Sequence, residues 1–339
     1  MYSTIELLKL LGSPFAKASA PKLDTKTLKR LYLCARKNRI SFFYLATVRE
    51  NYAKTLNELY ELYKEEDKKF LKTKKAIVKL SKTLEDGNIS YTFFKTIRPY
   101  KSTTVDLDVL ILKEYSSIFE IMHNAGYILI KRGPRSATFL DTEANIGIDL
   151  YEEVAASFII YFDKQSLATC VINLSLSNNV NVQALNPEAD LACIIAHSII
   201  KEQMYTLSEY YSFIHYLKQI NINDFIQTIK QNNITSATRT HASLTALLHN
   251  VAHKTIPKEL EEIVEALGEE KFETARLIQK NFETPHKYHP ITVAKCLLEI
   301  TKNKKTRNSI AMQIYQMLSP NFTKRFLAEL IQHIKRETY

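Results

Sequence analysis

The spacing of apolar and polar residues divides this 339-residue chain into three segments. In residues 1–86 apolar residues recur at helical spacing, which predicts helices, the longest starting within 41–49 and ending near Gly87. Residues 87–186 carry short alternating runs that are typical of strands, and 187–339 return to helical spacing. The pattern predicts an α+β protein in which a central mixed sheet is flanked by N-terminal and C-terminal α-helical segments.

The central segment is predicted to contain six strands and one helix. We expect the strands at Ile89–Phe94, Val105–Leu112, Tyr127–Lys131, Ser136–Leu140, Ile146–Tyr151 and Phe158–Phe162. A helix is expected at Glu114–Asn124, where Gly126 can terminate it.

Two aspartates one residue apart interrupt the apolar run 105–111. Alternation in a strand sends the odd-numbered apolar residues to one face, and Asp106 and Asp108 to the other. Two carboxylates a few ångströms apart repel one another unless a proton or a cation lies between them. The pair therefore predicts a site for a hard divalent ion, with Mg²⁺ as the first choice.

A second predicted strand, 145–151, contributes a third carboxylate, Asp149. If the two strands are neighbours, Asp106, Asp108 and Asp149 form a triad that can hold two Mg²⁺ ions, the arrangement used for phosphoryl transfer. The alternative is that all three are exposed polar residues of half-buried strands. Acidic residues are depleted in strands, which favours the metal site.

Positive charge is concentrated at the N-terminal end. Residues 1–85 hold 19 Lys and Arg against 9 Asp and Glu, an excess that equals the net charge of +10 for the whole chain. Lys68, Lys72, Lys75 and Lys79 on the long helix are candidates for binding a nucleic acid, RNA or tRNA in particular. A solvated surface that keeps the protein soluble is the open alternative.

The order of these features resembles the polymerase-β-type nucleotidyltransferase superfamily. A helix, a strand ending in 93–96 (Phe-Phe-Lys-Thr), the strand of Asp106 and Asp108, and the later Asp149 follow one another as in its catalytic domains. The chain is most similar to the little-characterised nucleotidyltransferase family in which a strand ending in lysine-glycine precedes an aspartate-x-aspartate strand and a helical domain follows. The resemblance covers about 86–215 and implies that the three aspartates bind metal and are catalytic.

The chain departs from the superfamily after the first predicted strand, where members usually carry a glycine followed by glycine or serine and this chain has Lys95-Thr96-Ile97. Side chains are then expected to bind the triphosphate in place of backbone amides. The candidates for nucleotide binding are Lys95, Thr96, Arg98 and Lys101 in the loop and Lys201 and Tyr210 in the following helices. Solvation is the alternative for the loop cations.

Two functions remain open. The first is a magnesium-dependent nucleotidyltransferase that moves a nucleoside monophosphate from an NTP, ATP included, to an acceptor, with RNA or tRNA favoured. The second is a catalytically degenerate protein of the same fold that binds nucleic acid or a protein partner. We expect a cytoplasmic protein without a membrane partner, since no apolar run approaches the length of a membrane span and no signal-sequence pattern is present.

Overall fold

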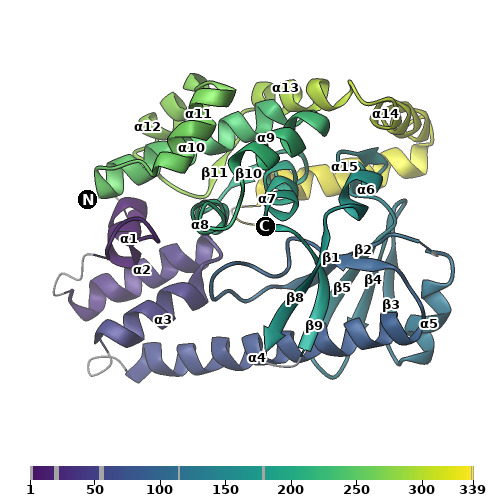
Figure 1. Cartoon of the computed structure of the whole chain (residues 1–339), viewed down its shortest axis with the longest axis horizontal. Helices are drawn as coiled ribbons and strands as arrows, with labels where there is room; N and C mark the ends of the chain where they lie inside the picture. The colour runs from purple at the N-terminus through teal and green to yellow at the C-terminus, as the bar shows by residue number, and fades with distance from the viewer. Residues whose placement is uncertain are drawn as a thin grey trace.

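A seven-stranded mixed sheet forms the centre of the computed structural model, which describes residues 3–18, 23–52, 57–113, 115–177, 180–336 and 338. The strand order is β3-β4-β5-β2-β1-β9-β8 (Figure 1). The strands are β1 (Tyr91–Phe93), β2 (Asp106–Ile111), β3 (Ile128–Arg132), β4 (Ser136–Asp141), β5 (Ile146–Tyr151), β8 (Val171–Ser177) and β9 (Val180–Leu185). Helices from both ends of the chain flank the sheet, which confirms the α+β prediction.

The central segment differs from the prediction at several places. The strand expected at 158–162 is reduced to β7 (Ile159–Ile160), which pairs only with β6 (Ala155–Ala156) outside the main sheet. Strands β8 and β9 were not predicted, although both alternate apolar residues with Ser, Asn or Gln. Val105, expected inside, is 69% exposed because β2 begins one residue later. The central helix, α5, covers Ile118–Asn124, and Glu114 lies outside the described residues.

The N-terminal segment contains the helices α1 (Ser3–Leu11), α2 (Thr25–Lys37), α3 (Ser41–Tyr52) and α4 (Asn57–Asp86). The single long helix expected from about residue 41 is therefore two helices, and α3 packs against α4. Helix α4 runs along the sheet (Figure 1), and its Ile77 and Leu80 share one core with Leu107 and Val109 of β2. Because side chains alternate along β2, Asp106 and Asp108 lie on the opposite face from α4.

The C-terminal segment is helical, as predicted, apart from the short pair β10 (Met204–Tyr205) and β11 (His286–Lys287). Its helices are α7 (Pro187–Ala196), a π-helical turn (His197–Lys201), α8 (Leu207–Tyr216), α9 (Ile222–Gln231), α10 (Thr235–His253), α11 (Lys258–Leu267), α12 (Lys271–Gln279), α13 (Pro290–Ile300), α14 (Lys304–Gln316) and α15 (Pro320–Lys335). The short α6 (Lys164–Ala168) precedes β8. Among the described residues, no helix is long and apolar enough to cross a membrane.

Helices from the two ends of the chain share one hydrophobic core. It joins apolar side chains of α1, α2 and α3 to those of α7, α8 and α10. Two long-range hydrogen bonds accompany this packing: Thr4 Oγ1 lies 3.1 Å from Thr284 Oγ1, and the Tyr211 hydroxyl donates to the Gly12 carbonyl at 3.2 Å. The division of the chain at residues 86 and 186 remains a prediction.

Candidate active site

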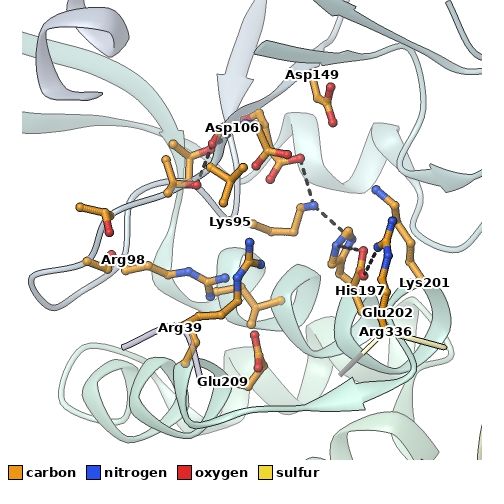
Figure 2. Close-up of a pocket in the computed structure, with 18 of the residues that line it drawn as sticks. Arg39, Lys95, Arg98, Asp106, Asp149, His197, Lys201, Glu202, Glu209 and Arg336 are labelled. Atoms are coloured by element: carbon orange, nitrogen blue, oxygen red, sulfur yellow. Dashed lines mark hydrogen bonds and ion pairs between the residues drawn. The ribbon is translucent and has the colours of Figure 1, made fainter. Parts of the chain in front are cut away.

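The three predicted acids come together because β2 and β5 are parallel neighbours. The register pairs Asp106 with Gly147 and Asp108 with Asp149. Their carboxylates line one wall of a cavity of about 550 Å³ (Figure 2). This volume lies within the usual range of small-molecule sites, roughly 300–1,000 Å³.

Cations from all three segments line the same cavity. Arg39 comes from the turn between α2 and α3, Arg98 from the loop before β2, Lys131 from β3, and Lys201 and Arg336 from the C-terminal segment. Figure 2 shows Asp106 and Asp149 on one side and Arg39, Arg98 and Lys201 extending toward the space between. The cavity thus offers positive charge for phosphates and carboxylate oxygens for a cation.

Asp106 is the acid with the least support from its surroundings. Burial and the negative charges of Asp108 and Asp149 raise its pKa to about 6. Asp149 is held differently, because the Thr138 hydroxyl donates to its Oδ1 at 2.6 Å. Among the described residues, neither Asp106 nor Asp149 forms an ion pair. These two carboxylates therefore have no cation of their own.

Asp108 has a cation, the ammonium group of Lys95. The Lys95 Nζ lies 3.2 Å from Asp108 Oδ1, and only 4% of the Lys95 side chain is exposed. Burial is the largest single influence and raises the pKa of Asp108, but the charges of Lys95, His197 and Lys201 and the hydrogen bond from Lys95 together outweigh it, so the net pKa is lowered. Figure 2 shows the Lys95 side chain extending between the acids and His197.

The backbone of Lys95 adopts a conformation that usually belongs to glycine. Its φ of 59° lies in the left-handed region, which costs a side-chain-bearing residue about 1–2 kcal/mol. The Lys95 amide donates to Asp190 Oδ1 at 2.5 Å, and the other oxygen of Asp190 accepts from the Tyr216 hydroxyl at 2.6 Å. A turn that usually requires glycine is thus made here with lysine, and Asp190 in the first turn of α7 holds it.

Thr96 connects this loop to β2. Its hydroxyl accepts from the Asp108 amide at 2.8 Å. Thr96 lines the cavity, but its side-chain oxygen is used to support the strand that carries the acids.

His197 lies behind Lys95 at the end of α7. Its Nδ1 is 3.1 Å from Lys95 Nζ and 3.0 Å from the Tyr161 hydroxyl, and its Nε2 is 3.2 Å from Glu202 Oε1. Burial, and then the charges of Lys95 and Lys201, lower its pKa to about 3. The ring is therefore neutral, with Nε2–H donating to Glu202 and Nδ1 accepting from Lys95.

Two predicted nucleotide ligands are not in the cavity. Tyr210 is fully buried and packs against Tyr211 and His249, because α8 is covered on every side by the C-terminal core. Lys101 is exposed and is not among the residues that line the cavity. Arg98 and Lys201 do line the cavity. The Arg98 Nη1 lies 3.0 Å from Ser212 Oγ, and the Lys201 Nζ lies 3.2 Å from the Tyr151 hydroxyl.

The four predicted nucleic-acid-binding lysines lie on α4, which covers the sheet face opposite the cavity. Lys68, Lys72 and Lys75 are exposed. Lys79 instead reaches the turn between β4 and β5, where its Nζ lies 3.4 Å from Asp141 Oδ1 and 3.1 Å from Glu143 Oε2.

Several residues of the cavity were not singled out from the sequence as site residues. These are Arg39, Lys131, His197, Glu202, Glu209 and Arg336. They are scattered over the whole chain, so no local spacing signals them. A histidine inside an apolar run, as at His197, is a signal that the sequence carried.

The donor atoms fit one divalent ion better than two. Carboxylate oxygens are the ligands that Mg²⁺ prefers, and Asp106 and Asp149 have no cation beside them. The third acid is paired with Lys95, and Asp149 is turned toward Thr138. In keeping with this, no group of three or more His, Cys, Asp or Glu converges on one point in the described part of the chain.

Comparison with solved structures gives distant likenesses, of which two are described below. No family model matches the chain, and no curated protein matches it. An antigenic nucleotidyltransferase-like protein from Paracoccidioides brasiliensis is similar with a TM-score of 0.28 and 13% identity, over 67% of this chain and 93% of that one. The STING-associated CdnE c-di-GMP synthase from Capnocytophaga granulosa is similar with a TM-score of 0.30 and 13% identity, over 85% and 99%. Neither likeness identifies the family of this chain.

Proposed function

We propose that the protein is a nucleotidyltransferase that uses an NTP and a divalent ion, Mg²⁺ by preference, to transfer a nucleoside monophosphate to an acceptor hydroxyl or phosphate, with release of pyrophosphate. One observation supports this most: Asp106, Asp108 and Asp149 line a cavity whose other walls carry five or more cationic side chains. A surface that only binds an anionic polymer gains nothing from clustered carboxylates.

In this proposal the acidic residues bind the ion and the basic residues bind the triphosphate. Asp106 and Asp149 would hold the ion, which would neutralise charge on the phosphates. Arg98 and Lys201 bind the triphosphate, and Asp149 accepts the proton of the attacking hydroxyl. Thr96 and Asp190 keep the loop in place, so that Lys95 meets Asp108.

Incorporation of α-labelled ATP, GTP, CTP and UTP, with and without Mg²⁺, tests the proposal. We expect Asp106→Asn and Asp149→Asn each to lower Mg²⁺-dependent incorporation by at least about a hundredfold. Glu152→Gln is the matched control, since Glu152 directly follows β5 and pairs with Arg135 outside the cavity. Unchanged incorporation in both aspartate variants would overturn the proposal.

RNA, tRNA included, is the acceptor that we favour, because the exposed Lys68, Lys72 and Lys75 form a positive stripe on α4. The start of α4 is linked to the cavity loop, where the Thr103 hydroxyl donates to Glu66 at 2.7 Å. A Lys68→Glu, Lys72→Glu, Lys75→Glu variant should lose RNA labelling and the salt dependence of RNA binding. Equal labelling by this variant would exclude the stripe as the RNA-binding surface.

A degenerate binding protein is the second candidate, and the ion pair between Lys95 and Asp108 is the observation that favours it. Thermal-shift measurements with each NTP, with and without Mg²⁺, separate the two. Stabilisation that requires both components supports the enzyme. Stabilisation by RNA alone supports the binding protein.

A further inference from the structure

The pocket around the Lys95 ammonium is built to hold a cation. One carboxylate oxygen, from Asp108, lies 3.2 Å away, and one ring nitrogen, from His197, lies 3.1 Å away. The rings of Phe94 and Tyr151 face the ammonium with their centroids at 4.7 and 5.4 Å. Each of these groups stabilises a positive charge that is shielded from water.

The surroundings fix which nitrogen of His197 can meet Lys95. Its Nε2 faces the Glu202 carboxylate at 3.2 Å and therefore carries the ring proton. The Nδ1 lone pair is left as the acceptor, and both the Lys95 ammonium at 3.1 Å and the Tyr161 hydroxyl at 3.0 Å face it. Contacts thus run from Glu202 to His197, from His197 to Lys95, and from Lys95 to Asp108.

The backbone shows that lysine at this position is held at a cost. A φ of 59° suits glycine, yet Asp190 and Thr96 hold the loop so that Lys95 keeps this conformation. A side chain whose only purpose was solubility would not be buried to 4% exposure beside Asp108.

We propose that the Lys95 ammonium is an internal cation that takes the place of one of the two divalent ions of a two-ion phosphoryl-transfer site, so that this chain binds a single divalent ion through Asp106 and Asp149. The comparison with a two-ion site rests on the proposed function, whereas the number and affinity of bound ions can be measured without it. The divalent ion must then share the acids with a fixed positive charge 3.2 Å from Asp108. Weak ion binding without nucleotide follows, because like charges repel in a site shielded from water.

Mn²⁺ titration of the full chain without nucleotide, followed by the electron paramagnetic resonance signal of free Mn²⁺, tests this. We expect Lys95→Met to tighten Mn²⁺ binding by about tenfold or more and to raise the number of bound ions from one to two. Lys201→Met is the control, because Lys201 lines the same cavity but its Nζ bonds the Tyr151 hydroxyl. It should tighten binding by less than about threefold.

Lys95→Gly is the second variant, since glycine adopts the observed φ and preserves the fold if methionine does not. It should tighten Mn²⁺ binding as Lys95→Met does. Equal affinity and ion number in the unmodified chain and both Lys95 variants would overturn the inference, as would an equal gain in Lys201→Met. The Mn²⁺ titration involves no turnover. A failed incorporation assay would therefore count against the proposed function without deciding how many Mn²⁺ ions the chain binds.

Discussion

Two buried acidic sites of this molecule are built in opposite ways. Glu273 on α12 is fully buried and receives four donors. Its Oε2 lies 2.6 Å from Arg276 and 2.8 Å from His286, and its Oε1 accepts from the His289 amide at 2.7 Å and the Thr292 hydroxyl at 2.6 Å. Although burial raises its pKa, the hydrogen bonds from His286, Thr292 and His289 lower it to about 2.

Asp106 is half-buried and lacks such support, and its pKa is raised to about 6. The comparison teaches that burial alone does not distinguish a structural acid from a functional one. A structural acid has its donors within the fold. Asp106 lacks such donors, which is the arrangement expected of an acid whose partner is a ligand.

The largest effect that the comparison predicts is on stability at Glu273. We expect Glu273→Gln to lower the free energy of unfolding by about 3 kcal/mol, because the new amide nitrogen would face Arg276 and His286, which are themselves donors. Urea denaturation at pH 7 measures it. A loss below about 0.5 kcal/mol would mean that the network is not structural.

Divalent ions should stabilise the protein through Asp106 and Asp149 and not through Glu273. At ten times the dissociation constant, Mn²⁺ should stabilise the unmodified chain by about 1.4 kcal/mol. Asp106→Asn and Asp149→Asn should lose this gain, while Glu273→Gln should keep it, because Glu273 lies outside the cavity. Thermal denaturation with and without Mn²⁺ checks this, and a gain retained by both aspartate variants would contradict it.

Without divalent ions, Asp106→Asn should raise the free energy of unfolding by about 1 kcal/mol at pH 7, since a buried, repelled charge is removed. Because the pKa of Asp106 is raised from 3.8 to about 6, its contribution to stability is complete below pH 3.8 and is lost as the pH rises through 6. The advantage of Asp106→Asn should therefore appear between pH 4 and 7.

Glu273 should have the opposite pH dependence. Its pKa is lowered from 4.5 to about 2, so its contribution is present above pH 4.5 and is lost as the pH falls through 2. Unfolding curves at pH 3, 5 and 7 distinguish the two acids. Parallel pH profiles for the two variants would break the comparison.

The smallest effect concerns the hydroxyl on Asp149. Thr138→Val removes the donor 2.6 Å from Asp149 Oδ1 and should lower the free energy of unfolding by about 1 kcal/mol or less. Incorporation should fall by less than about tenfold, and Thr138→Ser should restore it. A larger loss would give Thr138 a role in the reaction itself.

The sequence was sufficient to predict which strand face carries the three acids. It was insufficient to predict which residues surround them. Alternation in two strands predicted the face of Asp106, Asp108 and Asp149, and the parallel register of β2 and β5 brings these three together. Tyr210 was misjudged because helical spacing does not reveal that α8 is covered on all sides. Arg39 and Arg336, nearly 300 residues apart, meet only through the tertiary fold.

The departure at Lys95 illustrates the same limit. The sequence showed that lysine occupies the position of a conserved-looking turn in the resembling superfamily, but not that Asp190, 95 residues later, would hold its amide. A first-turn acid on α7 is explained by the helix dipole alone, so nothing local indicated this contact.

The core shared by the two ends of the chain has a consequence for synthesis. The apolar side chains of α1 pack on α10, which leaves the ribosome more than 220 residues later. At about 5–20 residues per second, α1 waits roughly 10 to 50 seconds for its partner. During that interval only α2, which also packs on α1, can shield Leu7, Leu8 and Leu11, and the side of α1 that α10 covers in the finished fold stays without its partner.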